Sequence, residues 1–164
     1  MQRVVENLSP EAFAPFGSVI TLPRREPTAS GAGFRWWGEL VTLRGGDRPY
    51  AIGFLDLDPG INRFDWAERH MLSDELIVPL TGECLVYVAP PDYLDEPERL
   101  PPLDRFRVFR VAPGQAVLLN TGVWHGAPLA DSARAQAMVI LLSGTAVQDT
   151  ALVRFEATPI DVVG

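Results

Sequence analysis

Glycine and proline divide this chain into short apolar segments, and that division limits the folds open to it. The sequence of 164 residues contains 14 Gly and 15 Pro. Between them lie about nine segments rich in β-branched, aromatic and leucine residues, a composition typical of strands. These segments are 17–22, 34–43, 50–57, 75–80, 83–90, 105–111, 115–120, 135–142 and 151–157. Short strands with turn signals between them predict an all-β fold, a sandwich or barrel of jelly-roll type.

Two segments depart from this strand pattern. The stretch SPEAFAPFG at 9–17 predicts a short helix, with Ser9 as N-cap, Pro10 in the first turn and Gly17 as the stop. The proline-rich stretch 89–102 predicts an exposed loop. Because no repeat and no change of composition divides the chain, we expect a single domain over 1–164.

Charge and residue content exclude several classes of function. A net charge of −7 argues against nucleic acid or an anionic membrane as the main partner. All 14 basic residues are arginine, so a Schiff-base lysine, and with it pyridoxal phosphate, is excluded. No glycine-rich nucleotide-binding motif occurs. The single cysteine, Cys84, excludes an internal disulfide and is expected to pack as a small buried residue. The sequence favours a cytoplasmic location.

The chain has only two histidines, and the first lies among carboxylates. In ERHMLSDE, residues 68–75, Glu68 and His70 share one strand face while Arg69 points the opposite way, toward solvent. Glu75 opens the next strand, and a turn between the two strands can bring it beside His70. An unpaired carboxylate at the start of a buried strand is costly, which favours a functional group there. His125 follows a turn at 120–122 and can face His70 across a barrel.

Both histidines lie in segments that resemble the two signature motifs of the cupin superfamily. Glu68, His70, Glu75 and Gly82 match the first motif except that glutamate replaces its first histidine. Gly114, Gly122 and His125 match the second motif except that Asn120 replaces its proline. The resemblance implies a cupin-type jelly-roll β-barrel.

A narrower resemblance extends over most of the chain. LSPEAFAPFGSVI, ERH, PLTGE and GVWHGAPL, in this order, are similar to segments of the ureidoglycolate lyase family of small cupins. That family cleaves ureidoglycolate to glyoxylate and urea in the breakdown of allantoin and purines. This chain departs from the family pattern at Ser30-Gly31-Ala32, Asn120-Thr121 and Leu141-Leu142, and it has Glu75 where the family usually has glutamine.

The resemblance implies roles for particular residues. His125, Glu75 and His70 are the candidate acid–base groups, since histidine titrates near neutrality and a buried glutamate can be tuned. Arg35 is a candidate for binding a substrate carboxylate in a bidentate manner. Asn120 and Trp124, in the second motif, are further candidates for substrate binding.

Three readings stay open from the sequence. The first is a metal-free lyase. The second is a cupin enzyme that acts on another small carboxylic acid with a divalent metal of the Mn, Fe, Ni or Zn group, held by Glu68, His70, Glu75 and His125. The third is a non-catalytic cupin that binds a small acid. Segments 17–22 and 34–43 offer apolar edges, and we expect a homodimer.

Overall fold

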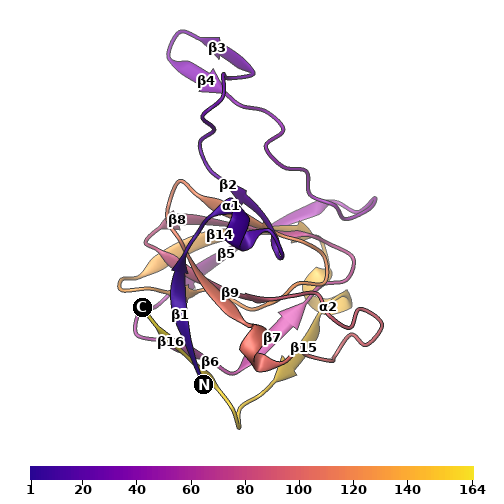
Figure 1. The fold of residues 1–164 in the computed structure, drawn as a ribbon. Coiled ribbons are helices and arrows are strands. Elements are labelled where there is room, and N and C mark those ends of the chain that lie inside the picture. Colours follow the sequence, from indigo (N-terminus) through magenta and orange to yellow (C-terminus); the bar gives the residue numbers. More distant parts are fainter.

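The computed structural model describes residues 1–164 and consists mainly of strands, with two short α-helices. Two sheets curve around a shared interior (Figure 1). The first and last strands of the chain pair side by side, and the Met1 ammonium donates to the Pro159 carbonyl at 3.2 Å. The jelly-roll β-barrel expected from the sequence is confirmed. No helix is long and apolar enough to cross a membrane.

The larger sheet has nine strands, which run around one side of the barrel. In order across the sheet they are β15 (Ala151–Arg154), β7 (Trp66–Arg69), β12 (Trp124–His125), β9 (Cys84–Ala89), β10 (Arg107–Val111), β1 (Gln2–Asn7), β16 (Ile160–Val163) and β6 (Arg63–Phe64), with β13 (Leu129–Ala130) also paired to β9. The five-stranded sheet consists of β2 (Gly17–Ile20), β11 (Ala116–Leu119), β8 (Glu75–Thr81), β14 (Ala135–Leu142) and β5 (Tyr50–Leu57).

The main core fills the space between the two sheets. Its members point inward from alternate positions of the strands, as Ile77 does on β8 and Val117 on β11. Phe13, Phe16 and Phe109 meet edge to face in this core, with ring centroids 5.1 to 5.9 Å apart. Cys84 is fully buried there, as expected from the sequence.

A second apolar cluster covers the outer face of the nine-stranded sheet. Phe64 stacks on Tyr87 of β9 at 3.9 Å between centroids, and Phe106 and Phe155 pack around this pair. Phe64 lies on β6, Tyr87 on β9, and Phe155 directly after β15. Strand β9, in the middle of the nine-stranded sheet, is therefore buried on both faces.

The predicted helix is shorter than the stretch 9–17. Helix α1 spans Pro10–Phe13, and the Ser9 hydroxyl caps it by accepting from the Ala12 amide at 3.1 Å. Ala14 keeps helical dihedrals as the C-cap, but Pro15 has no amide hydrogen to donate to the Glu11 carbonyl, which limits the helix to about one turn. Gly17 then opens β2, where a Cβ would lie 1.7 Å from the Leu118 carbonyl oxygen.

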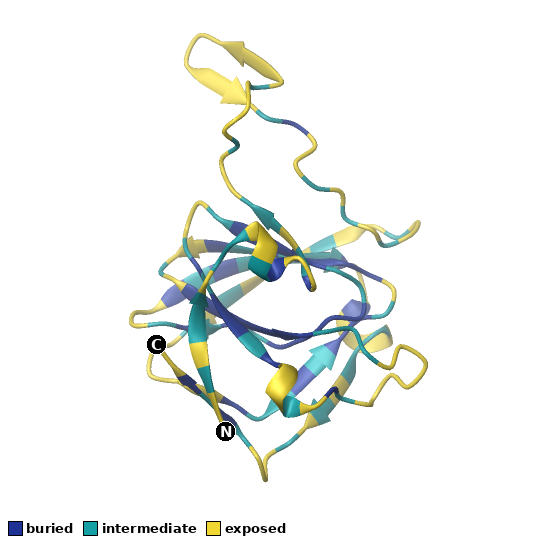
Figure 2. Cartoon of the chain, in the orientation of Figure 1, coloured by how far each residue is buried: buried dark blue, intermediate teal, exposed yellow.

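The predicted strand 34–43 is mostly wrong. Only β4 (Phe34–Trp36) forms, and it pairs with β3 (Ala29–Gly31) in a separate two-stranded hairpin. This hairpin stands at the end of a long excursion, residues 21–49, which we call the arm (Figure 1). The arm is exposed along most of its length (Figure 2). Glu39 has a φ of 52°, a left-handed conformation that ends any extended run.

Several elements were not expected from the sequence, among them β1, β16 and α2. Strands β1 and β16 pair in parallel with each other, and β1 also pairs in parallel with β10. Helix α2 (Thr145–Gln148) lies between β14 and β15. The loop at 89–102 forms as expected and leads into the 3-10 helix η1 (Leu103–Arg105).

Candidate functional site

Four of the predicted site residues meet at one end of the barrel. Glu68 lies on β7, His70 follows that strand directly, Glu75 opens β8, and His125 ends β12. Strand pairing positions them, because His125 is the register partner of Glu68 between β12 and β7. The turn at 71–74 brings Glu75 back toward His70, as the sequence predicted.

Glu75 lies between the two imidazoles. Its Oε2 is 3.2 Å from His70 Nε2 and 3.4 Å from His125 Nε2. All three side chains are almost fully buried. The two rings meet edge to face, with centroids 5.1 Å apart.

Backbone carbonyls fix the orientation of both rings. His70 Nδ1 lies 3.0 Å from the Asp149 carbonyl oxygen, and His125 Nδ1 lies 2.9 Å from the Val123 carbonyl oxygen. Because a carbonyl only accepts, Nδ1 of each ring carries the proton and Nε2 faces the shared centre. His125 Nε2 is buried and makes no hydrogen bond. Its lone pair is thus available to a ligand or a proton.

The charges of this group stabilise one another. Burial by itself would raise the pKa of Glu75, but the nearby imidazoles outweigh it and lower that pKa from 4.5 to about 2. Burial would lower the pKa of His125, but the charge of the Glu75 carboxylate, 3.4 Å away, raises it from 6.5 to about 9. In the absence of a bound cation the pair is therefore an imidazolium and a carboxylate at neutral pH.

The geometry fits a divalent metal. Glu68, His70 and His125 offer ligand atoms that all lie within 4.8 Å of one another. Two ligands each about 2.1 Å from a metal are roughly 3.0 to 3.4 Å apart at tetrahedral or octahedral angles. Glu75 meets this spacing to both imidazoles. Histidines whose other nitrogen donates to a carbonyl are the usual form of a metal ligand.

A cavity of about 260 Å³ opens beside this group. Its polar wall consists of Glu68, His70, Glu75 and Thr150, and its other walls are apolar or glycine. Helix α2 contributes Ala146 to the rim, a contribution that sequence reasoning missed. No arginine lines the cavity. A small anionic ligand therefore finds no guanidinium of this chain inside it.

Two aspartates hold the loop between β7 and β8 through hydrogen bonds. The Asp149 carboxylate accepts from the Met71 and Leu72 amides at 2.9 and 2.8 Å. Asp74 is fully buried, and its carboxylate accepts from Arg44 and from the amide and hydroxyl of Thr121. These two aspartates hold His70 and Glu75 in place from opposite sides. The sequence marks neither, because their partners lie far along the chain.

Asn120 does not lie in the cavity wall. Its side-chain oxygen accepts from the Arg44 guanidinium at 3.2 Å, and Arg44 also donates to the Asp74 carboxylate. It therefore belongs to the support around the site, where it joins the arm to the turn that precedes His125.

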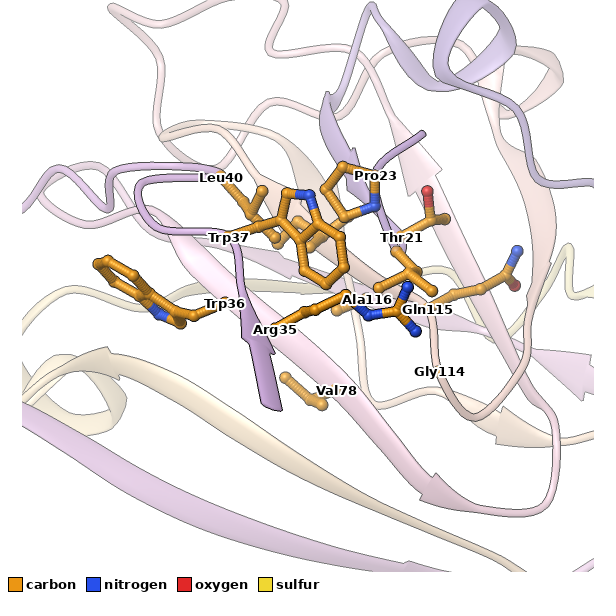
Figure 3. Close-up of a pocket in the computed structure, with 12 residues that line it drawn as sticks. Thr21, Pro23, Arg35, Trp36, Trp37, Leu40, Val78, Gly114, Gln115 and Ala116 are labelled. Carbon is orange, nitrogen blue, oxygen red and sulfur yellow. The ribbon is translucent and has the colours of Figure 1, made fainter. Parts of the chain in front are cut away.

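Arg35 and Trp124 lie away from the cavity. Arg35 is on the arm and lines a different groove, on the outside of the five-stranded sheet (Figure 3). Trp124 points to the opposite side of β12 from His125 and is fully buried in the outer apolar cluster. The expectation that Arg69 faces solvent is wrong, because its guanidinium is fully buried above the Trp124 ring.

The chain is similar to known proteins of one family. A family model described as ureidoglycolate lyase matches residues 2–162. A ureidoglycolate lyase of Rhodobacter capsulatus is 34% identical over 143 residues, which cover 77% of this chain and 78% of that protein. One of Pseudomonas fluorescens is 32% identical over 151 residues, covering 87% and 85%.

A solved structure supports the fold. A dTDP sugar isomerase of Desulfovibrio desulfuricans superposes with a TM-score of 0.52 at 16% identity, covering 87% of this chain and 88% of that one. At this identity the likeness concerns the jelly-roll fold alone.

Proposed function

The chain belongs to the ureidoglycolate lyase family, and we propose that it cleaves ureidoglycolate to glyoxylate and urea. The observation that carries this proposal is the buried Glu75 carboxylate between two oriented imidazoles beside a small cavity. We propose that residues 1–164 act as one domain and that the active form is a homodimer. The cytoplasmic location stays a prediction.

The reaction needs one proton removed and one supplied. The substrate hydroxyl loses its proton as the bond from carbon to the urea nitrogen breaks, and that carbon becomes the aldehyde of glyoxylate. The departing nitrogen takes up a proton and leaves as urea. No oxidant or water is consumed, so the site has only to move protons and hold the carboxylate.

Glu75 and His125 suit these two proton transfers. Glu75 is ionised at neutral pH and can accept the hydroxyl proton, whereas His125, with its pKa raised to about 9, carries one to donate. His70 lies close enough to Glu75 to hold the carboxylate in place. The pair returns to its starting state when the proton passes back from Glu75 to His125.

As an alternative to this metal-free arrangement, we propose that Glu68, His70, Glu75 and His125 hold a divalent metal of the Mn, Fe, Ni or Zn group, with Glu75 and His125 then serving as ligands and not as the acid–base pair. The unpartnered Nε2 of His125 supports this, because a buried nitrogen without a hydrogen bond is costly. When bound, such a metal would supply the positive charge that the cavity lacks. The protein would hold its ligands by the carbonyls on both Nδ1 atoms.

An assay of urea and glyoxylate release tests the function. Chelator-treated protein and protein incubated with Mn, Ni or Zn are each given ureidoglycolate. We expect turnover, and we expect His125→Ala and Glu75→Ala to lower it by about two orders of magnitude or more. Arg154→Ala, an exposed change on β15, is the control. If no turnover appears under any metal condition, the site acts on another small carboxylic acid or only binds one.

A further inference from the structure

We infer that the cavity beside Glu75 also takes N-acyl-2-hydroxyglycines whose acyl group is a short alkyl chain, and that it prefers them to ureidoglycolate. The inference rests on the proposed function and deepens it, because it keeps the reaction and assigns the class of leaving group. Ureidoglycolate is itself a 2-hydroxyglycine with a carbamoyl group on its nitrogen. The two kinds of substrate differ only beyond that carbonyl, where ureidoglycolate has an amino group and the inferred class has an alkyl group.

The cavity has one polar end. Its lining residues with ionisable or hydroxyl groups are Glu68, His70, Glu75 and Thr150. The Thr150 hydroxyl already has partners, since it donates to the Thr145 carbonyl at 3.1 Å and lies 3.3 Å from His70 Nδ1. The proton transfers require the substrate hydroxyl and the departing nitrogen to lie at this end, beside Glu75. The acyl group on that nitrogen then lies against the remaining walls.

The remaining walls carry no side chain that can form a hydrogen bond. They come from β5, β14, helix α2 and the segment after β12, and they consist of Gly53, Phe54, Leu55, Ala127, Pro128, Val139, Leu141 and Ala146. Val139 and Leu141 lie on the inward face of β14, which they share with the buried Ala137. Val139 is the register partner of Ile77, which shares one face of β8 with Glu75. The apolar wall therefore adjoins the reacting carboxylate.

Strand β5 leaves room for an alkyl chain. Gly53 is the register partner of Val139 and lies on the same face of β5 as Leu55, which packs on the main core. Gly53 is exposed and lines the cavity. A Cβ at this position would have only the Val139 carbonyl oxygen near it, at 3.8 Å, which is an ordinary contact distance. The space beside Gly53 is therefore free for a substrate.

An alkyl end suits these walls better than an amino end. The terminal amino group of ureidoglycolate has two N–H donors, and burying them against apolar side chains without partners is costly. A methyl group of nearly the same size has no such cost, and each further buried methylene should tighten binding about fourfold. The cavity of about 260 Å³ limits this gain to short chains, such as acetyl to butanoyl.

The reaction balances as it does for ureidoglycolate. Glu75 accepts the hydroxyl proton, the bond from carbon to nitrogen breaks, and its electron pair stays on the nitrogen. His125 donates a proton to that nitrogen. The products are glyoxylate and a primary amide in place of urea, and no oxidant or water is consumed. Because both kinds of substrate release glyoxylate, one assay compares them.

Glyoxylate release is the direct test. The protein, as purified and after chelator treatment followed by Mn, Ni or Zn, is given ureidoglycolate, N-acetyl-2-hydroxyglycine and N-butanoyl-2-hydroxyglycine. The first two compounds differ only by an amino group in place of a methyl group. We expect kcat/KM to be higher by about tenfold or more for the butanoyl compound than for ureidoglycolate, with the acetyl compound between them.

Analogues that cannot react separate binding from chemistry. N-butanoylglycine, N-acetylglycine and N-carbamoylglycine lack the hydroxyl and are not cleaved. Isothermal titration should show N-butanoylglycine binding more tightly than N-carbamoylglycine by about tenfold or more, with N-acetylglycine between them. Equal affinities, or tighter binding of N-carbamoylglycine, would overturn the inference.

Two variants locate the alkyl group. Gly53→Val fills the space beside Val139 and should lower the ratio of kcat/KM for the butanoyl compound to that for the acetyl compound by about tenfold. Val139→Thr adds a hydroxyl with little change of shape and should favour ureidoglycolate over the acetyl compound by about threefold to tenfold. Ile52→Val, next to Gly53 but 71% exposed on the opposite face of β5, is the matched control and should change neither ratio.

The outcomes distinguish this inference from the proposed function. Turnover of ureidoglycolate with slower or no cleavage of the N-acyl compounds would overturn the inference and leave the proposed function intact. Cleavage of the N-acyl compounds alone would support the inference and remove ureidoglycolate as the substrate. Cleavage of none of the three compounds would overturn both.

Discussion

The guanidinium of Arg69 lies over the indole of Trp124, with its central carbon 4.6 Å from the ring centroid. Its nitrogens donate to the carbonyls of residues 92, 93, 96 and 97, so one buried cation ties the proline-rich loop to β7. Burial lowers the pKa of Arg69, but the residue has four carbonyl partners in place of water. The two residues on either side of Arg69, Glu68 and His70, belong to the candidate site.

Replacing Arg69 with lysine should loosen this loop. Lysine keeps the charge but lacks the planar fork that reaches several carbonyls at once. Hydrogen bonds to charged groups contribute about 1.5 to 3 kcal/mol each, so we expect a loss of about 3 kcal/mol in the free energy of unfolding. Urea denaturation measures it. A protease that cuts after glutamate should also cleave the variant faster at Glu96 or Glu98. Arg63→Lys, at an exposed position, is the control and should change neither quantity.

Glu75→Gln tests whether Glu75 acts through its charge. The change keeps the shape of the side chain and removes its charge. We expect the affinity for Mn, Ni or Zn to fall at least tenfold and turnover of ureidoglycolate to fall with it, because a ligand and a base are lost together. Isothermal titration and the urea assay measure the two effects. Full turnover in a variant that binds no metal would show that a neutral amide suffices at this position.

Asp149 should act as a positioning residue for His70. Its carboxylate holds the Met71 and Leu72 amides, and its own carbonyl accepts from His70 Nδ1. We expect Asp149→Ala to weaken metal binding about 10- to 100-fold, as loss of a supporting partner does. Asp149→Asn keeps one accepting oxygen and should recover part of the affinity. Asp58→Ala, on the exposed turn after β5, is the control. If Asp149→Ala lowers the melting temperature and leaves metal affinity unchanged, the role is structural only.

The buried pair gives the chelator-treated protein a defined pH dependence. The pKa of His125 is raised from 6.5 to about 9, so its contribution to stability is complete below pH 6.5 and is lost as the pH rises toward 9. The pKa of Glu75 is lowered from 4.5 to about 2, so its contribution is complete above pH 4.5 and is lost as the pH falls toward 2. We expect the melting temperature to be highest between pH 4.5 and 6.5.

A variant isolates the alkaline part of this profile. His125→Gln has no imidazole to titrate, so its melting temperature should fall less between pH 6.5 and 9 than that of the wild type. Calorimetry of both proteins in the same chelator buffers gives the comparison. Parallel curves for the two proteins would mean that His125 is neutral in the folded state at pH 7.

Local patterns in the sequence determined many of the strands, the N-cap at Ser9, the buried Cys84 and the group around Glu75. Each depends on residues close together in the chain, or on a motif whose spacing places its side chains on one face of a strand. Two histidines in motif register and a carboxylate that opens a buried strand were sufficient to identify the candidate centre.

Only the tertiary structure decided the positions of Arg35, Arg69, Asn120 and Trp124. Segment 34–43 has strand composition, but it lies on an arm without a sheet to join, so Arg35 is held away from the cavity. Arg69 is buried because a loop more than twenty residues away supplies its partners. Asp74 and Asp149 bond residues as far as 47 and 78 positions distant. Sequence reasoning cannot foresee such contacts, because the environment of a charged side chain is set by whichever segments the fold brings to it.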